Sequence, residues 1–584
     1  MKKRLVASAT IFRFNYGEQV RNYLLICPFA HLHIDFLIFE FNSVNMKSIA
    51  LLSCFFLTTL LTYAQVNSSE SLPTVKTVNG TLQGTRVSGI SIFKGVPFAQ
   101  PPVGDLRWKE PQPVKNWEGT LKADHFSARP MQLPIYSDMN FRSPGISEDC
   151  LYLNIWTPSK TGKEELPVLV FFFGGGMKAG DASEYRYDGE SMSRKGIVAV
   201  TVNYRLGVFG FLAYPELSKE SSHHASGNYG LMDQTEALRW LHKNIAAFGG
   251  NPDNITIAGE SAGSSSVCAQ IVSPLPRNLF AGAIGESGSI LKFKEVVSLT
   301  EAEKIGLDYA KTVSANSLKE LRAMPAEQLL NATAKPARDD FPIDIDGYFF
   351  PESPLALYKS GRVAKVPVII GWNSEESGWK SILGDTDPTV ENYKTAVRKL
   401  YPANAEEILK LYAVSNDSDV VVVATSLASD RTNAFGSWRW VDLHTKTNSP
   451  VYRYFFTKAR PGLMADINKP KDTGAQVETN EKNFNGLGFF KGAVHSAEIE
   501  YALGNLPSNR VYDWQPGDYM VSTVMQDYFA NFIKFKNPNG TGLPYWPLYQ
   551  TWQKDPIMYL GYDTHRAPDK TRDRYLYFEK LNSN

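Results

Sequence analysis

The segment GESAG at residues 259–263 has residue types that could carry out nucleophilic chemistry. An apolar run ending at Ala258 precedes it and a run of small residues follows it, which is the strand–turn–helix context of a nucleophile elbow. Such a turn lifts the hydroxyl of Ser261 clear of a sheet, and a glycine two residues to either side leaves room for neighbouring backbone. An ordinary Gly/Ser loop is the alternative, and the preceding strand favours the nucleophile. A second segment, GESGS at residues 285–289, ends in serine where the last glycine is needed and does not fit the pattern.

A second glycine-rich segment could stabilise a developing negative charge. An apolar run at residues 168–173 leads directly into GGG at residues 174–176, so a loop can turn its backbone N–H groups toward one point without interference from side chains. HGGG-type loops contribute an oxyanion donor in this way, and the residue after the nucleophile, here Ala262, supplies another. Phe173 stands where that pattern has histidine. A flexible glycine turn is the alternative, but its pairing with the elbow favours an oxyanion hole.

Both segments need a rigid sheet to position them. Short, mostly apolar runs are typical of buried parallel strands, and they lie at residues 168–173, 197–203, 255–258, 366–370 and 451–456. Between them, the apolar spacing of residues 231–248 predicts a helix that ends at a pair of glycines. Strands that alternate with helices predict a mainly parallel sheet. We therefore expect one large α/β domain over residues 65–584.

Composition narrows the class of protein without choosing a function. The 584 residues are 43% hydrophobic and 21% charged, which is ordinary for a globular protein, and the length alone suggests roughly four domains. The 61 basic and 60 acidic side chains exclude binding to nucleic acid through overall charge. Four cysteines are too few for a disulfide-rich scaffold. The sequence contains no metal-binding motif, so we expect no metal and no cofactor.

Residues 46–64 have the layout of a secretory signal peptide. Lys47 provides a basic start, residues 49–61 are apolar, and residues 62–64 resemble a cleavage site. The apolar stretch would span about 20 Å as a helix, which is too short for a permanent membrane anchor. A buried helix is the less favoured alternative.

The position of this signal suggests which residues form the mature protein. Because it begins at an internal methionine, we expect residues 1–45 to be an extension that arises from a mis-assigned start. Residues 65–584 would then form the mature protein, secreted or periplasmic. Lipidation at Cys54 is the less favoured alternative, because too little apolar sequence precedes that cysteine.

Four further segments have a combination typical of one enzyme family. They are FKGVPFAQPPVGDLRW (93–108), EDCLYLNIWTP (148–158), VNYRLGVFGFL (202–212) and GNYGLMDQTEALRWLHKNIAAFGGNPDNITIAGESAG (227–263). With them, nearly all of residues 75–580 resembles the type-B carboxylesterase and cholinesterase family. The resemblance implies an α/β-hydrolase fold with a Ser-Glu-His triad at the base of a gorge. It also implies an oxyanion hole with three donors, the N–H groups of Gly175, Gly176 and Ala262.

The resemblance also places the two other members of the triad. The family's acid lies in a G-x-N-x-D-E pattern, which GWNSEE at residues 371–376 matches, so Glu376 is the expected acid in preference to its neighbour Glu375. The family's base lies in an H-x-x-E-I segment, which makes His495 the expected base. The order Ser261, Glu376, His495 is that of α/β-hydrolases. Glu260 matches an acidic residue that would support the charged histidine, and a solvated turn residue is the alternative.

Two departures from the family pattern bear on structure and specificity. The family usually pairs the cysteine of EDCLYLN with an upstream cysteine, but the chain has Met131 near that position. We therefore expect residues 131–149 not to be cross-linked, and Cys150 and Cys268 to be two buried free thiols. Cholinesterases place a choline-binding tryptophan in this loop, and the absence of tryptophan from it argues against a choline-ester specialist.

These residues together predict a serine carboxylesterase that works through an acyl-enzyme. A binding or adhesion protein on the same fold is one alternative, since fold does not fix function. An amidase or lactonase using the same site is another. The expected partner is a small-molecule ester, with no nucleic acid and no stable membrane span, and the oligomeric state is left open.

Overall fold

Short apolar runs build the centre of the sheet. Strands β11 (Leu166–Phe172), β12 (Val198–Val202) and β13 (Gly250–Glu260) pair in parallel, and most of their central residues are buried. Such side chains suit these strands because helices cover both faces of a parallel sheet. All five predicted strands are present, and the alternation of strands with helices confirms the predicted α/β class.

The computed structural model divides the chain into two units, Met1–Ser71 and Leu72–Asn584. In the first unit, the described residues are the antiparallel strands β1 (Thr10–Tyr16) and β2 (Gln19–Leu25). In the second unit, the described residues are 72–293, 296–334, 341–464, 492–550 and 556–583. The predicted signal peptide, with Cys54, lies outside the described residues, and the interpretation of residues 1–45 stays a prediction.

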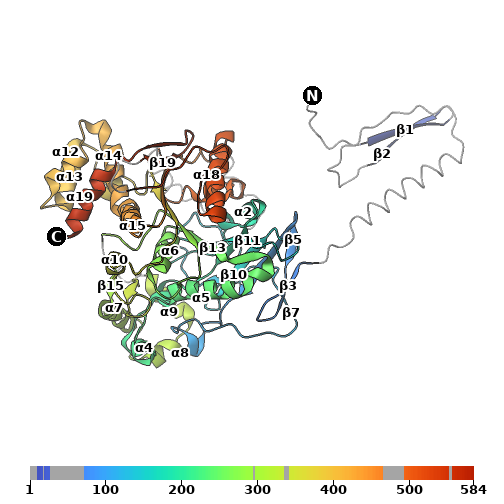
Figure 1. The fold of residues 1–584 in the computed structure, drawn as a ribbon, viewed down its shortest axis with the longest axis horizontal. Coiled ribbons are helices and arrows are strands. Elements are labelled where there is room, and N and C mark those ends of the chain that lie inside the picture. The colour runs from blue at the N-terminus through green and yellow to red at the C-terminus, as the bar shows by residue number, and fades with distance from the viewer. Residues whose placement is uncertain are drawn as a thin grey trace. The chain divides into compact units, whose positions relative to one another are not determined.

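One sheet of eleven strands organises the second unit (Figure 1). In spatial order the strands are β20 (His565–Pro568), β19 (Pro556–Leu560), β18 (Val451–Phe456), β17 (Val368–Asn373), β14 (Gly282–Glu286), β13, β11, β12, β10 (Tyr152–Thr157), β6 (Ile90–Pro97) and β5 (Thr85–Val87). The strands from β19 to β12 in this order are parallel. Antiparallel strands complete the two edges.

Smaller strands lie outside this sheet. They are β3 (Thr74–Lys76), β4 (Thr81–Gln83), β7 (Thr120–Lys122), β8 (Arg129–Pro130), β9 (Ile146–Ser147), β15 (Val297–Ser298) and β16 (Asp344–Ile345). The sequence patterns do not predict β14, although it lies in the middle of the large sheet. Its residues, GAIGE, include one bulky apolar side chain, so β14 lacks the apolar run that marks the other central strands.

The helices of the second unit lie on both faces of the sheet and also away from it (Figure 1). They are α2 (Glu190–Arg194), α3 (Gly207–Phe211), α4 (Pro215–Glu220), α5 (Tyr229–Asn244), α6 (Ala262–Val272), α7 (Leu299–Thr312), α8 (Leu318–Ala323), α9 (Ala326–Asn331), α10 (Pro354–Lys359), α11 (Lys380–Leu383), α12 (Val390–Leu400), α13 (Ala405–Leu411), α14 (Asp417–Ser429), α15 (Phe435–Thr445), α17 (Ile499–Leu503), α18 (Pro516–Phe535) and α19 (Arg572–Ser583). The predicted helix over residues 231–248 is α5 followed by a 3₁₀ turn, and it ends at Gly249 in the left-handed conformation.

Alternate side chains of β11 enter two different cores. Val168, Val170 and Phe172 pack in the cluster that contains the buried faces of α5 and α6. Leu169 and Phe171 pack in the cluster that contains α18. This alternation follows from the two-residue period of a strand, and it fixes β11 and β13 rigidly between helices. The carboxyl ends of these strands therefore form a stable platform for a site.

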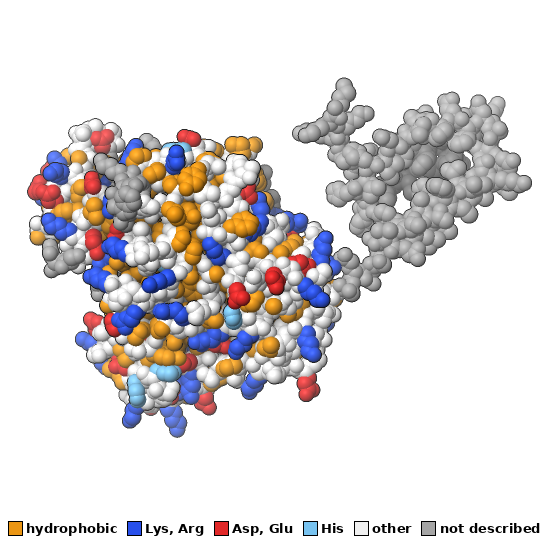
Figure 2. Space-filling view, viewed as in Figure 1, with side chains coloured by type: hydrophobic (Ala, Val, Ile, Leu, Met, Phe, Trp, Pro, Cys, Tyr) orange, Lys and Arg blue, Asp and Glu red, His pale blue; other side chains and the backbone are white. Residues whose placement is uncertain are grey.

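On the face shown in Figure 2, Lys and Arg side chains are scattered with Asp and Glu side chains among them. Among the residues that the structure describes, no helix combines the length and the apolar character that crossing a membrane requires.

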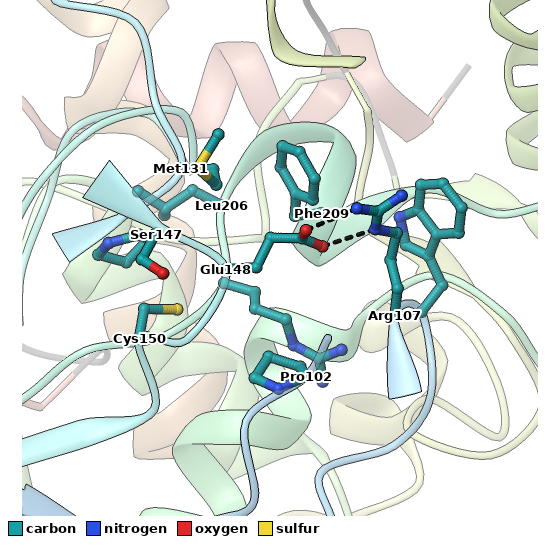
Figure 3. A pocket seen from close by; sticks show the side chains of 11 residues that line it. Pro102, Arg107, Met131, Ser147, Glu148, Cys150, Leu206 and Phe209 are labelled. Atoms are coloured by element: carbon teal, nitrogen blue, oxygen red, sulfur yellow. Dashed lines mark hydrogen bonds and ion pairs between the residues drawn. The ribbon is translucent and has the colours of Figure 1, made fainter. Parts of the chain in front are cut away.

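Cys150 and Cys268 are both free and buried, as predicted. Cys150 and Met131 line a small cavity beside the ion pair of Arg107 and Glu148, whose atoms Nη2 and Oε2 lie 2.6 Å apart (Figure 3). Burial raises the pKa of the Cys268 thiol to about 12 and that of Cys150 well above its ordinary value. Neither side chain is therefore a reactive thiolate at neutral pH.

Polar contacts, rather than a disulfide, hold the loop of residues 131–149. The side chain of Gln132 donates to the Gly180 carbonyl at 2.7 Å and accepts from the Gly180 N–H at 2.9 Å. In the middle of the loop, Arg142 pairs with Asp188 at 2.7 Å. Because both contacts join the loop to residues that follow the GGG segment, the loop is fixed beside that segment.

We expect the thiols of Cys150 and Cys268 to be silent until the protein unfolds. In the chain from residue 65 onward, Ellman's reagent should modify neither cysteine in native buffer and both in guanidinium chloride, because both are buried and unpaired. A thiol reductant should leave the melting temperature unchanged. A melting temperature that falls on reduction would show that a disulfide contributes to the fold.

Candidate active site

Ser261 lies at a strained turn between β13 and α6. Its backbone has φ 56° and ψ −118°, a conformation that residues with a side chain rarely adopt and that costs about 1–3 kcal/mol. A Cβ atom on Gly263 would come within 2.0 Å of the Phe172 carbonyl oxygen, and one on Gly259 within 2.5 Å of the Gly263 carbonyl carbon. The glycines predicted from the GESAG pattern are therefore required where strand and helix approach each other.

The segment at residues 285–289 supports this turn from the neighbouring strand. The Ser261 N–H donates to the Glu286 carbonyl at 2.8 Å. The Ser264 hydroxyl donates to the Gly288 carbonyl at 2.7 Å, and a Cβ atom on Gly288 would lie 2.1 Å from the Ser261 carbonyl oxygen. Ser287, at the centre of this segment, also has a positive φ of 57°, but its hydroxyl is buried and donates to Glu498 Oε1 at 2.6 Å.

His495 joins Ser261 to Glu376 through two hydrogen bonds. Its Nε2 atom lies 2.9 Å from Ser261 Oγ, and its Nδ1 atom lies 2.5 Å from Glu376 Oε2. The Glu376 side chain is buried, whereas the imidazole is about one-third exposed (34%). The structure thus brings together three residues that lie more than 100 residues apart in sequence, and it leaves the histidine accessible.

The turn after β17 holds both the acid and the loop that carries the histidine. The Asn373 N–H donates to Glu376 Oε1 at 2.7 Å, which leaves Oε2 facing the imidazole. The neighbouring Glu375 points elsewhere, because its Oε1 atom accepts from the Gly492 N–H at 2.8 Å. Glu376, and not Glu375, therefore contacts His495.

The GGG segment lies directly against the elbow. A Cβ atom on Gly174 would be 3.2 Å from Ser261 Cβ, and Gly175 has φ 106°, which only glycine adopts readily. Within the described part of the chain, the N–H groups of Gly175, Gly176 and Ala262 have no protein acceptor. Three backbone donors beside the Ser261 hydroxyl suit an oxyanion, and Ala262 adds the positive end of α6.

Glu260 faces the other side of the imidazole. It is 2% exposed, and its Oε1 atom lies 3.4 Å from His495 Nε2. The alternative that it is a solvated turn residue is therefore wrong. Burial raises the pKa of Glu260 to about 8.

Several carboxylates set the charge of the histidine. Burial alone lowers the pKa of His495, but the charges of Glu260 and Glu376 outweigh it and raise that pKa to about 10. Glu498 is fully buried as well, and burial raises its pKa to about 6 although the Ser287 hydroxyl donates to it at 2.6 Å. The site therefore stabilises a protonated imidazole.

The sequence patterns missed Asn433, which contacts two of the three central residues. It belongs to a π-helical turn, Asp430–Ala434, between α14 and α15. Its Nδ2 atom lies 3.4 Å from Glu376 Oε2 and 3.3 Å from His495 Nδ1. Turns of this kind are frequent at functional sites, but the sequence DRTNA carries no signal that distinguishes it from a regular helix.

Comparison with known proteins agrees with this geometry. The profile of the family described as "Carboxylesterase family" matches residues 71–578. Fumonisin B1 esterase from Sphingopyxis macrogoltabida is 31% identical over 515 residues, 83% of this chain and 86% of that protein. Carboxylesterase 1E from Mus musculus is 32% identical over 563 residues, 87% of this chain and 93% of that protein.

Solved structures show the same fold. A carboxylesterase from Geobacillus stearothermophilus matches with a TM-score of 0.71 at 28% identity, covering 86% of this chain and 99% of that one. A PNB esterase matches with a TM-score of 0.69 at 27% identity over the same shares of the two chains. The predicted α/β-hydrolase fold is thereby confirmed.

We expect Gly288→Ala to disturb the elbow without touching the side chain of Ser261, Glu376 or His495. The added methyl group would overlap the Ser261 carbonyl oxygen, so the unfolding free energy should fall by about 1–3 kcal/mol and hydrolysis of p-nitrophenyl acetate should slow. Gly436→Ala is the matched control, because a Cβ there meets nothing closer than 3.4 Å. Equal melting temperatures and rates for the two variants would contradict this account of the turn.

Proposed function

The chain belongs to the carboxylesterase family and is a carboxylic ester hydrolase, and we propose that Ser261, His495 and Glu376 are its catalytic triad. The observation that carries the proposal is the unbroken chain of hydrogen bonds from Ser261 Oγ to His495 and on to Glu376, at 2.9 and 2.5 Å. The strained backbone of Ser261 supports it, because such strain is typical of functional residues.

In the first half of the reaction, Ser261 Oγ attacks the carbonyl carbon of the ester and its proton passes to His495 Nε2. Glu376 holds the imidazole with Nε2 toward the serine and stabilises the imidazolium without taking its proton. The carbonyl oxygen becomes an oxyanion that accepts hydrogen bonds from Gly175, Gly176 and Ala262. Losing one such donor typically costs about 2.7–4 kcal/mol of transition-state stabilisation.

The second half releases both products. The bond to the alcohol breaks, and the proton on His495 passes to the departing oxygen, which leaves the acyl group on Ser261. A water molecule then gives a proton to His495 and attacks the acyl carbon. The bond to Ser261 Oγ breaks, the serine regains its proton and the carboxylic acid leaves.

Glu260 has a supporting role in this scheme. Its carboxylate lies beside Nε2, the atom that gains a proton during each attack. An ionised Glu260 therefore favours the imidazolium that forms in the transition state. Burial opposes that ionisation, and the positive histidine offsets part of the penalty.

We also propose that residues 65–584 form the working enzyme, exported under the direction of residues 46–64. The support comes from the sequence, in which a basic residue, an apolar stretch and a small-residue cleavage site follow one another. Both cysteines of this region are buried, so an oxidising compartment would not readily reach their thiols.

Replacement of the nucleophile tests the proposal directly. We expect Ser261→Ala to lose at least about a thousand-fold in kcat for p-nitrophenyl esters, while the matched control Ser265→Ala, on the first turn of α6, keeps most of the activity. Amides and lactones present the same carbonyl group and belong in the substrate panel. Undiminished hydrolysis by Ser261→Ala would remove this residue from the mechanism.

The pH dependence tests the role of Glu260. The base must be neutral to accept a proton, so the acid limb of the kcat/KM profile follows the pKa of His495, which the nearby carboxylates raise. Glu260→Gln removes one of those charges, so the acid limb should move to lower pH by about one unit or more and the maximal rate should fall. The exposed control Glu327→Gln should leave the profile in place. Superimposable profiles for wild type and Glu260→Gln would exclude the electrostatic role.

A further inference from the structure

Residues at or after the ends of two strands, β17 and β18, form hydrogen bonds to the loop that carries His495. One set of bonds lies before the histidine in sequence and the other lies after it. On the N-terminal side, the Asn373 side chain donates to the Val494 carbonyl at 2.7 Å, and the Glu375 N–H donates to the Ala493 carbonyl at 2.8 Å. Asn373 is the last residue of β17, and Glu375 lies in the turn that follows it. These contacts fix the chain immediately before the histidine, but they do not fix the peptide that follows it.

The residue after the histidine has an unfavourable backbone. Ser496 has φ 64°, in the left-handed region that residues with a Cβ atom avoid. Its conformation turns the chain from His495 into α17, and the orientation of the imidazole depends on that turn. A contact that holds the Ser496 peptide therefore also holds the catalytic histidine.

Arg460, which follows β18, makes that contact. Its Nη2 atom donates to the Ser496 carbonyl at 2.9 Å and pairs with Glu500 Oε2 at 2.9 Å. The side chains of Arg460 and Glu500 are 9% and 0% exposed. A buried pair of this kind is costly to separate, and the planar guanidinium offers its donors in a fixed arrangement. The guanidinium also stacks over Tyr512, at 5.1 Å from the ring centroid.

We propose that Arg460 is a positioning residue that holds the Ser496 carbonyl, and through it the imidazole of His495, within reach of Ser261 Oγ. The inference rests on the proposed function of His495 as the base. Arg460 touches neither the substrate nor the reacting atoms in this scheme. Glu500 orients the guanidinium, and the strand β18 supplies the rigid support.

The same segment offers a matched control for general loss of stability. Lys458 also follows β18, and it is buried in an ion pair with Asp518 at the start of α18, with Nζ and Oδ1 2.6 Å apart. Its partner belongs to a different element from the histidine loop. Lys458→Met and Arg460→Met therefore each remove one buried cation from the same stretch of chain, but only the second releases Ser496.

The experiment measures how fast diethyl p-nitrophenyl phosphate reacts with Ser261, because this step needs the histidine and the final amount of p-nitrophenol counts the folded sites. We expect Arg460→Met to react about 10- to 100-fold more slowly than wild type, as a misplaced catalytic group does, yet to reach full stoichiometry. With p-nitrophenyl acetate, kcat should fall to a similar extent while KM changes little. Lys458→Met should react at close to the wild-type rate even where its melting temperature falls as far.

A wild-type rate for Arg460→Met would overturn the proposal. So would equal slowing of both variants, which would assign the effect to stability. If Arg460→Met does not fold, Arg460→Lys decides: one ammonium group cannot reproduce the fork, so we expect about three- to ten-fold slower labelling, and an unchanged rate would overturn the proposal. His495→Ala separates the two hypotheses, because labelling at the wild-type rate there would refute the role of His495 itself.

Discussion

The backbone turn at Ser261 is the constraint on which the rest of the site depends. A serine in this conformation is unfavourable, so the surrounding structure must hold it. It does so by bringing the backbones of β11, α6 and the end of β14 so close together that Gly263 and Gly288 have no room for a side chain. Close packing of the sheet against the helices on both of its faces keeps these backbones in contact. The same approach places the GGG segment against Ser261, so one packing arrangement builds both the elbow and the proposed oxyanion donors.

Nearby charges then determine what the Ser261 hydroxyl can do. Glu260, Glu376 and Glu498 are all buried near one imidazole, and each carboxylate would be costly without a partner. Glu498 has the Ser287 hydroxyl and Glu376 has the Asn373 N–H. Glu260 Oε1 has no hydrogen-bond partner and faces the histidine instead. The free energy of an ionised Glu260 therefore depends on the protonation state of His495, which changes during acyl transfer in the proposed mechanism.

The sequence predicted those parts of the site that are local. GESAG and GGG each follow a strand, and their glycines have steric reasons that short patterns express. Glu376 and His495 could be placed only through the family resemblance, because more than 100 residues separate each from the serine. Asn433 and Arg460 could not be predicted in either way. The position of Asn433 depends on a π-helical turn that the sequence DRTNA does not indicate. The role of Arg460 depends on a contact made by the segment that follows β18. The solvated alternative for Glu260 failed for a related reason, since its burial comes from neighbouring strands.

The loop of residues 131–149, which the family usually closes with a disulfide and this chain holds by polar contacts, lies beside the candidate site. A disulfide stabilises a loop mainly by restricting the unfolded chain, whereas the contacts of Gln132 and Arg142 act only in the folded protein. Their effect is local: the loop brings the Met139 methyl group to 3.0 Å from the position of a Cβ atom on Gly175, and the Tyr136 hydroxyl to 3.1 Å from that on Gly176. Because these two glycines are oxyanion donors in the proposed mechanism, the contacts that close the loop also define one wall of the space open to an ester. The contacts of Gln132 and Arg142 therefore hold the loop and, through it, shape the side of the site next to Gly175 and Gly176.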